Sequence, residues 1–302
     1  MRGRAAFNDG MRRMILAAAD SRRVQRLVRR HGMRLGAGRF VAGETLDECV
    51  LVLRSLNERG LRANTTLLGE GVRDEAQAAA VTAAYEEVVQ RLADEGLRAN
   101  VALKLTHLGL ELDEEVAYGN VKRIVGHGSF IRIDMEQSAF VDATLRIYRR
   151  LRGDGLDNVG TVLQAYLYRS EADLGGLLPL QPNLRLVKGA YLEPAEIAYP
   201  RKPDVDAAYV RLLEASLSGD GYTAVATHDE RLIEHAIRFA DAVLELQMLY
   251  GVRPKLQAEL AARGYQVLVA TPYGPEWYPY LMRRLGERPA NLLFFAKNLI
   301  RA

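Results

Sequence analysis

Residues 184–191 read Leu-Arg-Leu-Val-Lys-Gly-Ala-Tyr, and this stretch indicates the fold more clearly than any other. Its mainly apolar start predicts a short buried strand, which ends in a lysine, a glycine and an aromatic residue. Arg185 and Lys188 lie three positions apart, so in a strand of period two they point to opposite faces. Gly189 and Ala190 are small enough for a ligand to lie against the backbone. Taken alone, the stretch is more simply a structural strand whose cations pair with carboxylates.

Around this stretch the chain repeats one unit eight times: a short apolar run, a polar residue and an amphipathic helix. The predicted strands are 64–68, 101–105, 130–133, 159–163, 184–187, 224–226, 243–246 and 267–270. The predicted helices are 75–93, 113–124, 139–151, a short one from Ser170, 204–218, 230–240, 254–263 and a last one reaching Arg284. This alternation predicts an α/β fold in which parallel strands close into a (βα)8 barrel. A doubly wound open sheet is the competing fold, but no Gly-x-Gly-x-x-Gly follows the first strand.

Composition limits the class of protein. The chain has 302 residues, of which 49% are hydrophobic, and this is enough for one large core. Its single cysteine, Cys49, excludes a disulfide framework within the chain and a cysteine-rich metal site, so we expect no metal and a reducing, cytoplasmic location. No apolar run approaches the roughly 20 residues of a membrane span, and the first residues lack the apolar core of a secretion signal.

The N-terminal residues 1–60 are expected to form basic and amphipathic helices, 11–30 and 44–58, ahead of a barrel domain over 61–302. The first 40 residues contain eleven arginines and two aspartates, a net charge of +9, so the remaining residues carry −6 of the total of +3. Such an arm could bind anionic lipid peripherally at the inner face of the membrane, or it could dock on the acidic body as a solvated helix. Phe7 and Phe40 lie outside the arginine run, so no aromatic platform accompanies it and we expect no nucleic acid partner.

In a (βα)8 barrel the chemistry lies at the carboxyl ends of the strands. Here those ends offer Glu70, Lys104, Asp134, Gln164, Arg185 with Lys188, His228, Gln247, and a Pro272-Tyr273 turn that leads to Arg283 and Arg284. A purely structural rim would show mainly serine, asparagine, glycine and proline turns. The sequence therefore predicts one polar site at this end of the barrel.

The charges of this rim predict an anionic ligand. Lys104, Arg283 and Arg284 outnumber the carboxylates of Glu70 and Asp134, and a planar carboxylate suits the two-pronged guanidinium. Adjacent arginines on a helix diverge by roughly 100°, so one could face substrate and the other a cofactor or carboxylate. A surface helix with two solvated arginines is the alternative.

Two further segments suggest a small substrate. The stretch 273–280 carries four aromatic residues near the arginine pair, enough to wall a small ring. The loop 189–203 contains three prolines and is longer than most strand-to-helix connections, so it could cover the mouth of the pocket. An aromatic wall beside a carboxylate clamp describes a site for a small amino acid.

Seven motifs, in order, resemble the proline dehydrogenases, especially the bacterial monofunctional type, over most of residues 40–301. They are 68–70, 103–105, 132–136, 158–170, 184–191, 226–229 and 280–285. The resemblance implies a distorted (βα)8 barrel with its last helix above the mouth and a non-covalently bound FAD. It also implies oxidation of L-proline to Δ1-pyrroline-5-carboxylate and transfer of the electrons to a membrane quinone.

The resemblance also implies roles for individual residues. The proline carboxylate would be held by Lys104, Arg283 and Arg284, the pyrrolidine ring walled by Tyr191, Leu249 and Tyr280, and the cations kept in place by Asp134 and Glu70. Arg185 would donate to the flavin N5 and Gln164 would meet the edge of the ring. The rest of the cofactor site would comprise Met135, Val187, Lys188, Gly189, Ala190, Thr227, His228 and Gln247.

The chain departs from the family pattern at two places. Ala270 stands where the family usually has a tyrosine, so we expect Tyr273 to supply that wall or the wall to be missing. Leu244 and Leu246 flank Glu245 where the family usually has aromatics, so looser packing beneath the flavin is expected.

Two other functions compete with this hypothesis. A barrel with Lys104 or Lys188 at its strand ends could be a Schiff-base aldolase, although a carboxylate beside the amine opposes the neutral form that imine chemistry needs. A non-catalytic scaffold could use the basic arm to bind lipid or nucleic acid, and it would be colourless.

Overall fold

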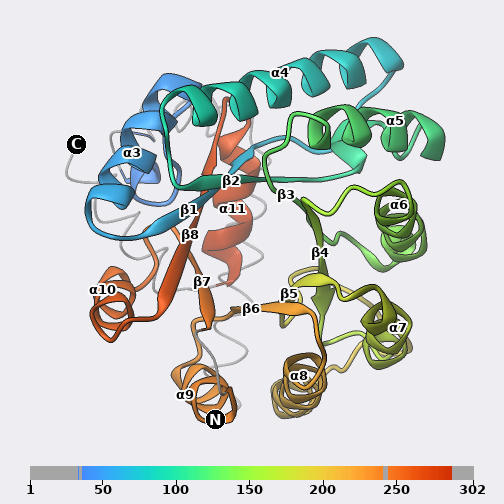
Figure 1. Cartoon of the computed structure of the whole chain (residues 1–302), viewed down its shortest axis with the longest axis vertical. Coiled ribbons are helices and arrows are strands. Elements are labelled where there is room, and N and C mark those ends of the chain that lie inside the picture. The colour runs from blue at the N-terminus through green and yellow to red at the C-terminus, as the bar shows by residue number, and fades with distance from the viewer. Residues whose placement is uncertain (1–32, 34–35, 241–243, 288–302) are drawn as a thin grey trace.

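The computed structural model describes residues 33, 36–240 and 244–287, the last five of them as backbone only. Its eight strands are all parallel and close into a barrel in chain order, from β1 to β8 and back to β1. Helices surround this ring on the outside (Figure 1). The predicted (βα)8 barrel is therefore confirmed.

The strands follow the predicted apolar runs within a few residues. They are β1 (Arg62–Leu67), β2 (Ala99–Leu103), β3 (Ile131–Ile133), β4 (Val159–Gln164), β5 (Asn183–Val187), β6 (Tyr222–Ala226), β7 (Glu245–Leu249) and β8 (Gln266–Tyr273). The prediction for the seventh strand was wrong by about two residues, because polar Gln247 was expected to follow the strand. In the structure Gln247 lies in the middle of β7, and its side chain points into the barrel.

The helices begin close to where their capping residues stand. They are α3 (Leu46–Glu58), α4 (Glu75–Asp94), α5 (Glu114–Val125), α6 (Val141–Gly153), α7 (Ser170–Leu177), α8 (Lys202–Leu217), α9 (Glu230–Phe239), α10 (Pro254–Ala262) and α11 (Trp277–Glu287). Short 3-10 turns are η1 (Ala37–Arg39), η2 (Thr106–Leu108), η3 (Ser138–Phe140) and η4 (Leu178–Leu180). Thr45 and Glu48 form a capping box on α3, and Asp74 caps α4, which satisfies backbone N–H groups that these helices leave free.

The main core lies between the strands and the surrounding helices. Two buried tyrosines tie helices to strand ends: Tyr85 of α4 donates to the carbonyl of Leu67 at 3.2 Å, and Tyr209 of α8 donates to the carbonyl of Leu186 at 3.1 Å. A buried tyrosine hydroxyl needs such a partner, and the ring adds a large apolar area. These contacts fix the carboxyl ends of β1 and β5, where the site is built.

The inside of the barrel is unusually polar. Arg185 of β5 contacts Asn64 of β1 and Gln247 of β7, and such contacts between alternate strands cross the barrel interior. Arg132 of β3 is also fully buried and donates to the carbonyls of Thr161 and Asn183. Barrel interiors are usually filled by branched apolar residues, so this charged interior indicates a function at the axis.

The last helix crosses the ring of strands in Figure 1. Trp277 and Leu281 of α11 are buried in a second apolar cluster with Phe40, Val41 and Leu68, the residue that follows β1. This packing places α11 over the barrel mouth, as predicted.

The N-terminal part is described only from residue 33, so the predicted helix 11–30 and the charge of the arm lie outside the described residues. Cys49, Leu53 and Leu56 of α3 belong to the same core as the barrel strands, and the division at residue 60 stays a prediction. No helix in the described ranges combines the length and apolar character needed to cross a membrane.

Candidate active site

One cavity of about 840 Å³ opens at the carboxyl ends of the strands, a volume within the usual range for ligand sites. All ten residues of the expected cofactor set line it: Met135, Gln164, Arg185, Val187, Lys188, Gly189, Ala190, Thr227, His228 and Gln247. The expected substrate residues that also line it are Lys104, Asp134, Tyr191, Leu249 and Tyr280. The structure thus brings the cofactor set and these five substrate residues together, while their individual roles stay predictions.

Arg185 lies at the base of this cavity and is held on three sides. Its Nε donates to Oε1 of Gln247 at 2.5 Å, its Nη1 to Oδ1 of Asp134 at 2.7 Å, and its Nη2 to Oδ1 of Asn64 at 3.2 Å. The residue is only 8% exposed, so a positive charge is fixed where polar partners, and little water, surround it. Such a guanidinium can stabilise negative charge that develops in the cavity.

Lys104 follows the end of β2 and forms an ion pair with Glu70, which follows β1. Glu70 therefore holds a cation, as expected, although it is not among the residues that line the cavity. Asp134 was expected to hold the cations of the substrate site, and among the described residues it pairs with Arg185 at 2.7 Å. Asp134 directly follows β3, and only β4 separates β3 from β5, which carries Arg185.

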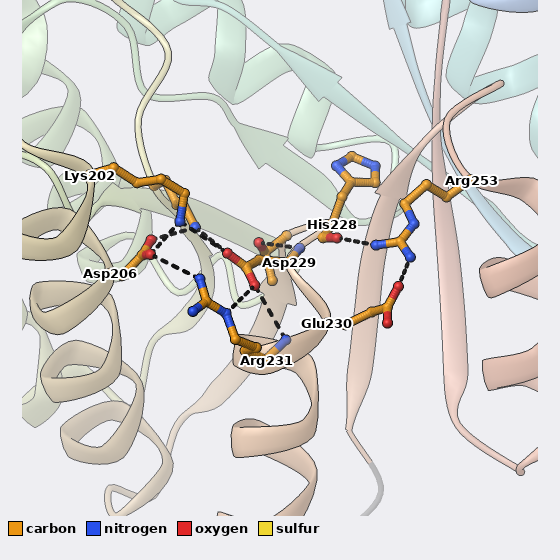
Figure 2. Close-up of polar contacts among 9 residues, drawn as sticks. Lys202, Asp206, His228, Asp229, Glu230, Arg231 and Arg253 are labelled. Carbon is orange, nitrogen blue, oxygen red and sulfur yellow. Dashed lines mark hydrogen bonds and ion pairs between the residues drawn. The ribbon is translucent and has the colours of Figure 1, made fainter. Parts of the chain in front are cut away.

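A cluster of charges forms the outer end of the cavity (Figure 2). Asp206 of α8 and Asp229, which caps α9, share the ammonium groups of Lys188 and Lys202. Lys188 lies 2.5 Å from Asp206 and 3.0 Å from Asp229. Burial works against the charged carboxylate of Asp229, but the hydrogen bonds from the two lysines outweigh it and lower its pKa to about 2. Arg231, 82% exposed at its side chain, lies 3.6 Å from Asp229.

Beside this cluster, Arg253 connects two strand ends. Its guanidinium donates to the carbonyl of His228 at 2.7 Å and pairs with Glu230 (Figure 2). The ring of His228 in turn accepts from the backbone N–H of Leu249 at 3.0 Å. The positions of a predicted cofactor residue, His228, and a predicted substrate residue, Leu249, are therefore coupled.

The loop between β5 and α8 is fastened over the end of β4. Gly189 has a φ of +118°, and a side chain added there would lie 2.1 Å from the ring of Tyr166. We had expected a glycine here to make room for a ligand, and the structure shows that it makes room for Tyr166 as well. Leu167 and Ala198 form an isolated antiparallel bridge, so the loop is anchored and lies along the cavity edge.

Arg283 and Arg284 lie in α11, whose Tyr280 lines the cavity, but their side chains fall outside the described residues. Their assignment to the substrate carboxylate stays a prediction that the position of α11 supports.

Comparison with known proteins identifies the family of this chain. The family model described as "Proline dehydrogenase" matches residues 50–297. The chain belongs to the proline dehydrogenase family. It is 39% identical to Proline dehydrogenase 1 of Bacillus subtilis over 96% of this chain and 99% of that protein. It is 41% identical to the Proline dehydrogenase of Deinococcus radiodurans, over 96% of this chain and 98% of the other.

The fold also matches a solved structure. Proline utilization A (PutA) from Bdellovibrio bacteriovorus, inactivated by N-propargylglycine, superposes with a TM-score of 0.78 at 25% identity. The match covers 83% of this chain and 32% of that one, so this chain corresponds to about a third of the larger protein. The chain is an oxidoreductase of the proline dehydrogenase family, whose activity is the oxidation of proline in proline catabolism.

The structure describes both places where the chain departs from the family pattern. Tyr273 does not replace the missing side chain at Ala270, because it is buried in the core and is not among the residues that line the cavity. Leu244 and Leu246 alternate with the inward Glu245 and are buried in the core outside the barrel, and looser packing beneath the flavin stays a prediction.

Sequence reasoning missed several residues of this proline dehydrogenase cavity. Asn64 accepts a hydrogen bond from Nη2 of Arg185. It is the first residue of the predicted strand 64–68, and no local pattern marks it as a site residue. Lys202, Arg231 and Arg253 lie on helix starts after β5, β6 and β7, and all three line the cavity. In the sequence only their position could have indicated that these residues belong to the site. The first residues of a helix that follows a barrel strand lie at the same end of the barrel as the active site.

The Schiff-base alternative finds no support in these contacts. Lys188 hydrogen-bonds two carboxylates, Lys104 pairs with one, and membership in the proline dehydrogenase family provides a different chemistry.

Proposed function

We propose that the chain oxidises L-proline to Δ1-pyrroline-5-carboxylate with a non-covalently bound FAD as the acceptor. A C–H bond at Cδ of proline breaks with its electron pair, the ring nitrogen loses a proton, and a C=N bond forms. When bound, the flavin would take up the hydride and pass the two electrons on to a membrane quinone. The proposal depends mainly on one observation: Lys104 and Arg185 line the same cavity. Lys104 is a cation that can bind a carboxylate, and Arg185 is a buried guanidinium.

The donor set of the cavity fits FAD from one end to the other. At the base, Arg185 supplies a fixed positive donor for the redox-active ring, and Gln164 stands at the end of β4 beside it. At the outer end, Lys188, Lys202 and Arg231 exceed the charge of Asp206 and Asp229 by one, which suits an anionic pyrophosphate. Gly189, Ala190, Thr227 and His228 also line the cavity and would hold the ribityl chain and the pyrophosphate.

The substrate would lie on the side of α11. Lys104 offers an ammonium group to the proline carboxylate, and Tyr191, Leu249 and Tyr280 form a mainly apolar wall for the pyrrolidine ring. Arg283 and Arg284 would complete the carboxylate clamp. Glu70 keeps the Lys104 ammonium in place until the carboxylate of proline arrives.

The colour of the purified protein tests this function. We expect a yellow preparation that is bleached by L-proline without oxygen, because the two electrons from the substrate reduce the flavin. D-proline and glycine are the controls. Lys104→Met should remain yellow and bleach only at a much higher proline concentration, since it keeps the cofactor residues and loses the carboxylate cation. A colourless protein that FAD cannot restore would contradict the proposal.

Quinone reduction requires access to the bilayer, and we propose that the basic N-terminal arm provides it. Each basic residue near an anionic surface contributes about 1 kcal/mol, so eleven arginines are sufficient for peripheral binding. We expect the full chain to float with vesicles that contain anionic lipid and to sediment at high salt. Deletion of residues 1–32, which keeps Ala37 and Phe40 of the second apolar cluster, should abolish flotation and leave bleaching by proline unchanged. Equal flotation of both forms would rule out the arm as the membrane anchor.

A further inference from the structure

Glu245 is a buried carboxylate to which neither the sequence analysis nor the proposed reaction gives a role. It lies in β7, is 6% exposed, and shares the inner face of the strand with Gln247, two residues further on. Its Oε1 accepts a hydrogen bond from Nε2 of Gln247 at 2.6 Å. Burial of a carboxylate is costly unless the group is hydrogen-bonded or paired with a cation, so the contacts of Glu245 must offset this cost.

The amide of Gln247 is enclosed between two groups of opposite hydrogen-bonding character. A carboxylate can only accept, so Glu245 must face the NH2 group of the amide. A guanidinium can only donate, so Nε of Arg185 must face the amide oxygen, and the two lie 2.5 Å apart. The reversed amide would place a donor against a donor and an acceptor against an acceptor. Only one orientation of Gln247 satisfies both neighbours.

The other amide that contacts Arg185 has a neutral second neighbour. Asn64 accepts from Nη2 of Arg185 and donates to the side chain of Asn100. Arg185 fixes which end of the Asn64 amide faces it, but the amide of Asn100 carries both a donor and an acceptor and can adapt to Asn64. On the Nε side of Arg185, by contrast, the far end of the amide is held by the carboxylate of Glu245, which can only accept.

We propose that Glu245 is a positioning residue, which fixes the amide of Gln247 and through it the guanidinium of Arg185 at the base of the cavity. Glu245 does not reach the cavity itself. Glu245 acts from a position deeper in the barrel, two residues before Gln247 on β7. There it also lies near the buried Arg132 and 4.0 Å from Arg62. The part of this inference that concerns FAD rests on the function proposed above.

Two substitutions of Glu245 separate positioning from charge. Glu245→Gln and Glu245→Met both remove the negative charge beside Arg132, but only glutamine keeps an oxygen that can accept from Gln247. If Glu245 served only to neutralise Arg132, both variants would behave alike. If it positions Gln247, methionine should have the larger effect and glutamine should partly rescue it.

The midpoint potential of the bound flavin reports the difference. A guanidinium that is no longer fixed stabilises the reduced flavin less, so the potential should become more negative. For Glu245→Met we expect about a tenfold change in the ratio of reduced to oxidised flavin, which corresponds to about 30 mV for two electrons. For Glu245→Gln we expect less than half of that shift. Equal shifts in the two variants, or no shift in either, would overturn the proposal.

Crystal structures of the variants provide a readout that is independent of flavin. In Glu245→Met the Nε of Arg185 should lose its contact with Gln247, whereas an unchanged contact would overturn the proposal even if no flavin is bound. Should Glu245→Met fail to fold, Arg132→Met/Glu245→Met removes both buried charges and is compared with Arg132→Met alone. Wild-type protein that binds no flavin would contradict the proposed function, while the structures would still decide the role of Glu245.

Discussion

Replacement of Arg185 by alanine should lower the turnover of proline by about 10²- to 10³-fold, the usual effect of removing one preorganised donor from a developing negative charge. The expectation rests on three hydrogen bonds that aim the guanidinium into the cavity and on its 8% exposure, which limits screening by water. Stopped-flow reduction of the flavin by proline, at saturating FAD, measures the effect directly.

Arg231→Ala is the matched control, because it removes a second cavity arginine at the exposed outer end. This variant should weaken FAD binding and leave the reduction rate unchanged once FAD is saturating. Arg185→Lys should recover only part of the lost rate, since an ammonium cannot keep three fixed donors. A normal reduction rate in fully loaded Arg185→Ala would remove Arg185 from the chemistry.

His107 should make the protein sensitive to mild acid. Its side chain is buried behind Gly69, its Nδ1 has no hydrogen-bond partner within the described part of the chain, and burial, helped by Lys104 and opposed by Glu70, lowers its pKa to about 4. The folded state therefore binds this proton only near pH 4, whereas the unfolded chain binds it near pH 6.5. The contribution of the neutral His107 ring to the free energy of unfolding is therefore fully present above pH 6.5, and it is lost as the pH falls to about 4.

The expected slope within that window is at most about 1.4 kcal/mol per pH unit from this one group. Denaturant unfolding between pH 7 and pH 4 measures it. His107→Leu should flatten the profile, because it removes the titrating group and an unpaired buried nitrogen. His127→Gln, at an exposed site, controls for the loss of an imidazole. A His107→Leu profile as steep as that of the wild type would show that other groups cause the acid sensitivity.

The architecture could be predicted from the sequence because strand and helix periods are local. Residues 184–187, for example, mark β5 correctly to within one residue. The rim of polar residues was also predictable, since parallel strands end at one face of a barrel. The ten cofactor residues and five substrate residues that line the cavity came from motif resemblance together with this rule.

The remainder depends on contacts between distant residues. Nothing near Asp134 indicates that it pairs with Arg185, 51 positions away, and nothing near Lys188 indicates Asp206 and Asp229. The misplaced seventh strand has the same origin. Gln247 looks like a residue that follows a strand, because an apolar interior is the normal expectation, and its partners Arg185 and Glu245 inside the barrel stabilise it there.

The closure of the barrel has a consequence for biosynthesis. The hydroxyl of Thr65 in β1 donates to the carbonyl of Thr271 in β8 across 206 positions of the chain, and six residue pairs join these strands. Bringing such distant segments together carries a large entropy cost and slows folding. While the ribosome is still extending the chain towards residue 273, β1 waits with an exposed edge. The cavity in which we propose that FAD binds is lined by Ala270, Thr271 and Pro272 of β8, so we expect flavin binding to follow the synthesis of these residues.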